Sequence, residues 1–216
     1  MTTFLPLGPA DARWTLLLAH GAGAAMDSSF MNTICALLAE QHIATLRFEF
    51  AYMAGRRDGG KKRPPPKAEL LMPEYVAAVA EARALAAAKP LFIGGKSMGG
   101  RVASMVAENL SAQQQIHGLV CLGYPFHAPN TPDKLRTPQL VNLTCPALIV
   151  QGTRDPFGTQ AEVQALTLSA AIAFHWADDG DHDLGPRGAS GFTRKGNLTA
   201  ATLAIAAFMA TNVPPP

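Results

Sequence analysis

The chain has 216 residues, 48% of them hydrophobic and 16% charged, and its formal net charge at pH 7 is +2. This length fits one α/β domain with a sizeable core and is short for two. The small net charge gives no whole-chain argument for binding nucleic acid, and no run of about 18 apolar residues offers a membrane span. We therefore expect a single domain over residues 1–213, with residues 214–216 as a proline tail.

Cysteine usage and the N-terminal sequence bear on the cellular compartment. Cys35, Cys121 and Cys145 are an odd number of cysteines in apolar settings, and they lack the spacing of metal ligands. This usage is typical of buried free thiols in a reducing compartment. The first residues lack the basic segment and the long apolar segment of a signal peptide. We expect a cytoplasmic protein with neither a metal nor another cofactor.

Short apolar runs alternate with helical patterns along the chain. Strands are predicted at residues 14–19, 43–48, 91–93, 117–122, 147–150 and 172–176. Helices are predicted at about residues 27–41, 74–89, 98–110, 160–168 and 197–211. Repeated strand–helix alternation favours a mostly parallel sheet of about six or seven strands, covered by helices on both faces in a three-layer α/β architecture.

Ser97 lies in the motif Gly95-Lys96-Ser97-Met98-Gly99, between an apolar run and a helical segment. This pattern is typical of a nucleophile elbow, in which a serine occupies a strained strand-to-helix turn. Glycines two residues on either side let the strand and the helix approach closely. The pattern predicts that Ser97 is a nucleophile. As the neighbour of Ser97 on a tight turn, Lys96 is expected to point away from the site.

Other chemistry-bearing residues follow other predicted strands, and in a parallel sheet the carboxyl ends of the strands form the usual ligand site. Asp155 follows the strand at 147–150, and His182 follows the last strand. A serine hydroxyl needs an imidazole to take its proton and a carboxylate to orient that imidazole. We therefore predict His182 as the base and Asp155 as its orienting acid. The competing carboxylates for that role are Asp178, Asp179, Asp181 and Asp183.

An oxyanion formed at Ser97 needs two preorganised N–H donors. The predicted donors are the backbone amide of Met98 and one amide from the loop at 20–23. Ala22 is our first choice in that loop, with Gly21 and Gly23 as alternatives.

The remaining histidines have other predicted roles. His20 is expected to support its glycine-containing loop, and His42, His117 and His175 are interpreted as packing or surface residues. His127 and the adjacent Phe126 are candidates for binding the substrate, although His127 is equally interpretable as an ordinary loop residue.

The order Ser97, Asp155, His182 resembles that of the α/β-hydrolase superfamily. Together with the segments at 18–23, 94–101, 152–155 and 180–187, it resembles the small, lidless branch of that superfamily. This branch includes dienelactone-hydrolase-like enzymes and the hydrolase-like subunit of a histone-acetyltransferase complex. The first clear strand begins near residue 14, which leaves little room for the antiparallel hairpin that usually opens the fold. The stretch 126–146 is too short for a helical lid, so we expect an open, shallow site.

A basic segment at residues 56–67 contains six Lys and Arg residues and the run Pro64-Pro65-Pro66. One interpretation is a solvated, proline-stiffened loop. The alternative is a basic rim at the active-site side of the sheet that attracts an anionic substrate or an acidic partner.

These features together predict a serine hydrolase that cleaves a carboxylic ester or a similar acyl bond of a small molecule through an acyl-enzyme. A thioesterase, a peptidase or a C–C hydrolase on the same residues is an alternative. A non-catalytic interaction protein of the same fold is another. Because an open sheet has exposed edges, a homodimer is plausible.

Overall fold

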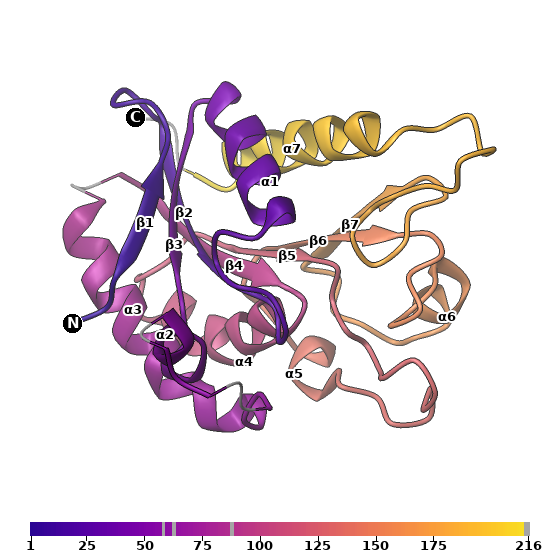
Figure 1. Cartoon of the computed structure of the whole chain (residues 1–216), viewed down its shortest axis with the longest axis horizontal. Helices are drawn as coiled ribbons and strands as arrows, with labels where there is room; N and C mark the ends of the chain where they lie inside the picture. Colours follow the sequence, from indigo (N-terminus) through magenta and orange to yellow (C-terminus); the bar gives the residue numbers. More distant parts are fainter. Residues whose placement is uncertain (58, 62–63, 87–88, 214–216) are drawn as a thin grey trace.

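The computed structural model describes residues 1–57, 59–61, 64–86 and 89–213. It shows a seven-stranded sheet in the order β1-β3-β2-β4-β5-β6-β7 (Figure 1). Strand β1 runs antiparallel to β3, and the other neighbouring strands are parallel. The strands are β1 (Phe4–Leu7), β2 (Trp14–Ala19), β3 (Ile43–Phe48), β4 (Leu91–Lys96), β5 (Leu119–Leu122), β6 (Ala147–Gly152) and β7 (Ile172–Ala177). The proposed tail at 214–216 lies outside the described residues.

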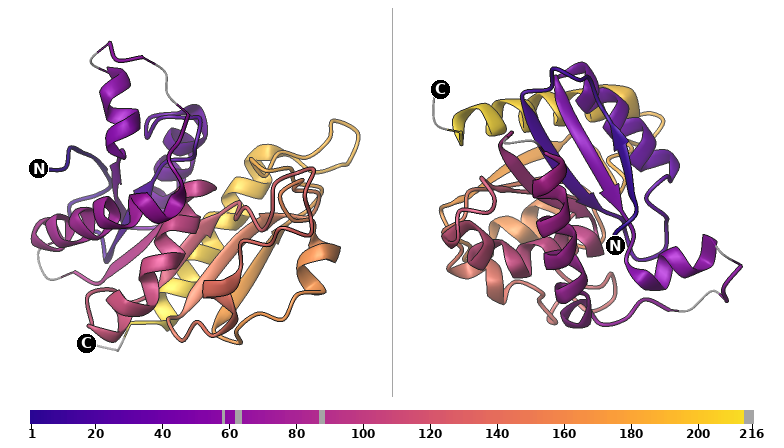
Figure 2. Two further views of the ribbon diagram at one scale, coloured as in Figure 1. Left: turned by 90° about the horizontal axis from the view of Figure 1, so that it is seen from below. Right: turned by 90° about the vertical axis from the view of Figure 1, so that its left-hand side faces the viewer.

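Helices cover both faces of the sheet (Figures 1 and 2). Helices α1 (Ser29–Glu40) and α7 (Arg194–Thr211) lie on one face, and α3 (Met72–Leu85) and α4 (Met98–Ala112) lie on the other. Three short helices, α2 (Ala51–Arg57), α5 (Pro138–Val141) and α6 (Gln160–Gln164), and the 3₁₀ turn at Ala68–Leu71 belong to the connections. The expected three-layer α/β architecture is therefore confirmed.

The central strands are buried on both faces, which explains their nearly continuous apolar sequences. Along β2, Leu16 and Leu18 contact the layer of α1 and α7, whereas Leu17 contacts the layer of α3 and α4. This alternation follows from the two-residue period of a strand. The three cysteines are free and buried, as expected from their apolar settings.

The structure contains elements that the sequence patterns did not predict. Strand β1 is only four residues long, is partly exposed and contains Pro6, which suits an edge strand. Its residue Phe4 pairs with Phe48 of β3. The chain before residue 14 therefore does provide an antiparallel opening strand, although not a hairpin. Helices α2 and α5 were also missed because they are short and lack a helical apolar period.

The segment between β5 and β6 contains, in its described residues, only the four-residue helix α5. No lid is built there, which confirms the expectation of a small lidless fold. Within the described part of the chain, no helix is both long enough and apolar enough to cross a membrane.

Candidate active site

Ser97 lies between β4 and α4 with backbone φ of 52° and ψ of −115°. A non-glycine residue in such a conformation is strained by on the order of 1–3 kcal/mol and needs support from its surroundings. The Ser97 N–H donates to the Leu122 carbonyl at 2.9 Å, and the Arg101 N–H donates to the Ser97 carbonyl at 3.0 Å. The neighbouring strand and the first turn of α4 thus hold the strained residue.

The two motif glycines allow close packing at the elbow. A Cβ atom at Gly95 would lie 2.6 Å from the Ala19 carbonyl oxygen, and one at Gly99 would lie 2.5 Å from the same oxygen. Neither distance is tolerable, so a side chain at either position would push β4 and α4 away from β2. The Gly-x-Ser-x-Gly spacing is a steric requirement of this turn.

The structure brings Ser97, His182 and Asp155 into one chain of hydrogen bonds. His182 Nε2 lies 2.9 Å from Ser97 Oγ, and His182 Nδ1 lies 2.8 Å from Asp155 Oδ2. Because a carboxylate only accepts, Nδ1 carries the proton and Nε2 is free to accept the serine O–H. The Asp155 side chain is completely buried, whereas that of His182 is 21% exposed. The geometry is that of a nucleophile, a base and an orienting acid.

Asp155 is itself fixed by two donors besides His182. The Phe157 N–H donates to its Oδ1 at 2.8 Å, and Gln151 Nε2 donates to its Oδ2 at 2.9 Å. Gln151 is fully buried at the end of β6, and its Oε1 accepts the Tyr124 N–H at 2.7 Å. Sequence reasoning missed Gln151, although a polar residue that ends a buried apolar strand was an available signal.

Three of the four competing aspartates engage other groups: Asp183 lies 3.2 Å from Lys96 Nζ. Asp179 binds Arg154 and Arg187, and the hydrogen bonds from Arg187 lower the pKa of Asp179 to about 2. Asp181 closes its own loop by accepting the N–H groups of Asp183 and Gly185. These contacts shape the loop that carries His182 and leave Asp155 as the carboxylate at its ring.

Lys96 does not simply point away from the site, contrary to the expectation for its place in the turn. Its Nζ donates to the His182 carbonyl at 2.8 Å and lies 3.2 Å from Asp183 Oδ1. The residue is only 7% exposed, and burial lowers the pKa of its ammonium group, although Asp183 opposes this shift. The Lys96 side chain does not bond the Ser97 hydroxyl. Its ammonium group instead binds the backbone of His182 and helps to hold that residue in place.

The loop at 20–23 borders the nucleophile. A Cβ at Gly21 would lie 3.8 Å from Ser97 Cβ. His20 is buried, and burial lowers its pKa. Its Nδ1–H donates to the Gly21 carbonyl at 2.6 Å, while its Nε2 accepts the Phe50 N–H at 3.2 Å. His20 thus contacts the loop it was expected to support.

Ala22 and Met98, the two predicted oxyanion donors, lie on segments next to Ser97. Met98 is the first residue of α4, so its N–H has no acceptor within the helix. Ala22 is held by Tyr52, whose hydroxyl donates to the Ala22 carbonyl at 3.0 Å. Burial raises the pKa of Tyr52 to about 12, so the phenol keeps its proton at neutral pH. Tyr52 lies in the unpredicted helix α2 and was not identified from the sequence.

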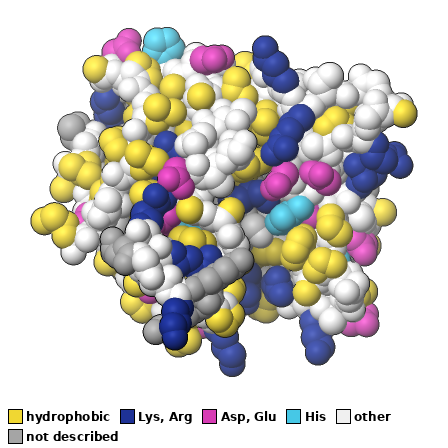
Figure 3. Space-filling view, in the orientation of Figure 1, with side chains coloured by type: hydrophobic (Ala, Val, Ile, Leu, Met, Phe, Trp, Pro, Cys, Tyr) yellow, Lys and Arg dark blue, Asp and Glu magenta, His cyan; other side chains and the backbone are white. Residues whose placement is uncertain are grey.

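Phe126 and His127, the candidate substrate residues, are both buried and line a common cavity of about 460 Å³. Phe157 is a further neighbour of the base, since its ring centroid lies 4.3 Å from that of His182. Figure 3 shows hydrophobic side chains gathered beside a surface histidine and acidic groups on the face in view.

Two arginines of the basic segment already contact other groups of the protein. Arg57 ends α2 and pairs with Glu49 at 2.7 Å and with Asp27 at 2.9 Å. Arg56 lies over the Tyr52 ring, with its guanidinium carbon 5.5 Å from the ring centroid. Lys62 and Arg63 lie outside the described residues. Attraction of an anionic partner by this segment stays a prediction.

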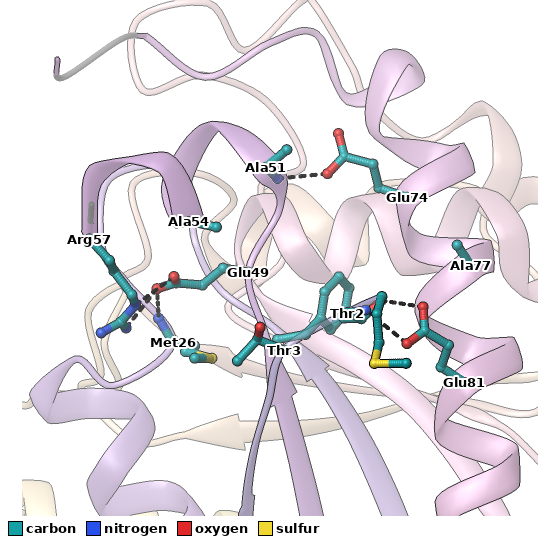
Figure 4. Close-up of a pocket in the computed structure, with 12 residues that line it drawn as sticks. Thr2, Thr3, Met26, Glu49, Ala51, Ala54, Arg57, Glu74, Ala77 and Glu81 are labelled. Atoms are coloured by element: carbon teal, nitrogen blue, oxygen red, sulfur yellow. Dashed lines mark hydrogen bonds and ion pairs between the residues drawn. The ribbon is translucent and has the colours of Figure 1, made fainter. Parts of the chain in front are cut away.

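A separate cavity of about 530 Å³ lies beside β1 and α3 (Figure 4). Its carboxylates already bind protein groups: Glu74 accepts the Ala51 N–H, and Glu81 accepts both the N–H and the hydroxyl of Thr2. These carboxylates are thus already engaged within the protein, and we assign this cavity no part in the chemistry.

Comparison with known proteins places the chain in a family. Residues 12–210 match the family model described as an alpha/beta hydrolase domain. A dienelactone hydrolase from Anabaena variabilis superposes with a TM-score of 0.72 and 19% identity, over 97% of this chain and 91% of that one. A serine hydrolase without a lid from Xanthomonas campestris gives a TM-score of 0.68 and 15% identity, over 100% and 96%.

A monoacylglycerol lipase from Paleococcus ferrophilus gives a TM-score of 0.66 and 15% identity, over 99% of this chain and 100% of that one. At such low identities these structures establish the fold alone. The family match covers most of the chain, however, and agrees with the sheet order, the elbow and the missing lid. The chain belongs to the α/β-hydrolase family, as a small member without a lid.

Proposed function

We propose that this protein is a serine hydrolase that cleaves a carboxylic ester through an acyl-enzyme. The observation that carries the proposal is the continuous chain of hydrogen bonds from Ser97 Oγ through His182 to the buried Asp155. Such a chain at a strained elbow places a hydroxyl, a proton acceptor and an orienting charge in the positions that acyl transfer requires.

The steps follow from these contacts. Ser97 Oγ attacks the ester carbonyl carbon while His182 Nε2 takes the hydroxyl proton. The carbonyl oxygen becomes an oxyanion, and the proposed donors to it are the amides of Met98 and Ala22. Collapse breaks the bond to the alcohol, and the alcohol leaves with the proton from Nε2. A water then repeats the sequence on the acyl-enzyme, releasing the acid and restoring Ser97.

The preference for esters rests on solved structures that superpose on this chain. They include a dienelactone hydrolase and a monoacylglycerol lipase, both named for ester substrates. A thioester, an amide or a carbon–carbon bond would meet the same Ser97, His182 and Asp155, so hydrolysis of those substrates is measured beside that of the ester.

The first experiment is labelling with a fluorophosphonate probe, followed by hydrolysis of 4-nitrophenyl acetate. We expect the parent to be labelled and Ser97→Ala to be unlabelled and slower by at least about 10³-fold, the scale of losing a triad member. Ser104→Ala is the matched control, since Ser104 Oγ donates to the Arg101 carbonyl within α4 and does not contact the triad. A parent that is folded by circular dichroism but unlabelled would instead support a non-catalytic interaction protein.

A further inference from the structure

The cavity of about 460 Å³ between the 126–135 segment and α6 has a mostly apolar wall with one polar corner. Its apolar lining includes Phe126, Leu135, Val163 and Leu166, and its polar lining consists of His127, Asp133 and Glu162. This size and composition are usual for a pocket that binds a small organic group.

The polar corner contains a buried acceptor without a donor. His127 is 4% exposed, and its Nδ1 lies 3.0 Å from the Ala128 carbonyl, so Nδ1 carries the proton. In a neutral ring, Nε2 is then a bare acceptor. Nε2 is buried and has no hydrogen-bond partner among the described residues. A buried polar atom without a partner destabilises the fold, and a ligand that supplies the missing donor would recover that loss.

The neighbouring carboxylate does not supply that donor. Glu162 Oε2 lies 3.6 Å from His127 Nε2, beyond hydrogen-bond distance. The same oxygen already accepts the Thr159 N–H at 2.8 Å and the Thr159 hydroxyl at 2.7 Å. These bonds lower the pKa of Glu162, which is ionised at neutral pH and can only accept. With the His127 ring neutral, Nε2 and the Glu162 carboxylate are therefore two neighbouring acceptors without a donor between them.

None of Ser97, Asp155 and His182 lines this cavity, and the turn at 155–158 connects its polar corner to them. The His127 N–H donates to the Phe157 carbonyl at 3.2 Å, while the Phe157 ring packs on His182. Gly158 adjoins the cavity so closely that a Cβ there would lie 2.7 Å from the Phe126 ring. The same turn begins with Asp155, so the cavity wall and the orienting acid are parts of one short segment.

We propose that this cavity binds an apolar part of the ester substrate that carries a hydroxyl group, and that this hydroxyl donates to His127 Nε2. The inference rests on the proposed function for the identity of the ligand as substrate. We assign a neutral hydroxyl because one donor meets Nε2, while Glu162 already accepts two hydrogen bonds from Thr159.

The kinetic test compares 4-nitrophenyl hexanoate with 4-nitrophenyl 6-hydroxyhexanoate. We expect the parent to hydrolyse the hydroxylated ester with a kcat/KM about tenfold higher, the effect of one buried hydrogen bond. His127→Phe should abolish this preference by slowing the hydroxylated ester alone. Leu166→Ala, the control in the apolar wall, should slow both esters and keep the preference. Equal rates in the parent, or a preference that survives His127→Phe, would overturn the proposal.

A binding test separates this inference from the proposed activity. Titrations of p-cresol and toluene, which differ by one hydroxyl, are followed by NMR at the amides of the cavity residues in the whole protein. Tighter binding of p-cresol that disappears in His127→Phe supports the hydroxyl site, whether or not Ser97 is labelled by the fluorophosphonate. Binding without ester hydrolysis would overturn the substrate role, and no shift at the cavity amides would overturn the site itself.

Discussion

Replacing Gln151 by methionine tests whether the hydrogen bonds of this buried amide hold Asp155 in place. The two side chains have similar length, but methionine supplies none of the hydrogen bonds of the buried amide. Gln151 Nε2 donates to Asp155 Oδ2 at 2.9 Å, to the Tyr124 carbonyl at 3.1 Å and to the Gly158 carbonyl at 3.2 Å. Breaking such a buried network on one side costs about 3–5 kcal/mol in the free energy of unfolding.

The activity should fall as well, because Asp155 loses one of its donors and the His182 ring loses part of its alignment. A displacement of about 1 Å at reacting groups costs on the order of 10²-fold in rate, so we expect kcat to fall by about that factor. Urea denaturation and ester hydrolysis measure the two effects.

Gln139→Met is the matched control for this experiment. Gln139 is a half-buried glutamine whose Nε2 donates to the Tyr124 hydroxyl at 2.6 Å and to Ser104 Oγ at 3.0 Å, away from Asp155. We expect it to reduce stability and leave kcat near that of the parent. Equal losses of kcat in both variants, or wild-type kcat in Gln151→Met, would refute the role given to Gln151.

Three further changes give expected outcomes. Asp155→Asn keeps the shape but not the charge, and kcat should drop by about 10⁴-fold with a folded protein, as measured by ester hydrolysis and near-UV circular dichroism. Tyr52→Phe removes the bond to the Ala22 carbonyl, and kcat should fall by up to about tenfold with KM little changed. Burial lowers the pKa of Lys96 below 10.5, so the unfolded chain holds that proton more tightly and stability rises with pH between the two pKa values. Urea denaturation from pH 7 to pH 10 should show that this rise is missing in Lys96→Met and retained in Lys89→Met, a variant of a lysine outside the site.

The architecture was predictable from the sequence because the features that determine it are local. The strand at 14–19 is a continuous apolar run, and the Ser97 motif combines a turn and two close contacts within five residues. His182 and Asp155 were predicted because parallel strands bring their carboxyl ends together. Ser97, Asp155 and His182 could thus be identified from local sequence patterns together with the parallel topology that brings strand ends together.

The supports of the site were not predictable in the same way, because each depends on a contact between segments that no local pattern links. Tyr52 reaches Ala22 from a short helix, and Phe157 reaches His182 across two loops. Lys96 was misjudged because the rule for alternating directions on a turn ignores the length of its side chain. Four methylenes let its ammonium group bind the His182 carbonyl, 86 residues away in the sequence.

The distribution of backbone strain indicates where the fold is constrained by its site. Among the described residues, five other than glycine have positive φ. His42 and Gln114 immediately follow the C-caps of α1 and α4, where a left-handed residue is an ordinary helix ending. Ser97, Asp179 and Leu184 instead lie in the elbow and in the loop that carries His182.

These strained residues are kept in place by many local hydrogen bonds and ion pairs, and not by a segment that moves. The His182 loop is held by Lys96, by the Asp181 turn and by the ion pairs of Asp179. Since no lid lies between β5 and β6 in the described chain, closure of a lid there does not supply discrimination between substrates. In the proposed enzyme, discrimination would then rest on fixed walls such as those of the cavity at His127, whose Nε2 is buried and has no hydrogen-bond partner among the described residues. If the protein prefers substrates that carry a hydroxyl group, we therefore expect this preference to require no change in its conformation.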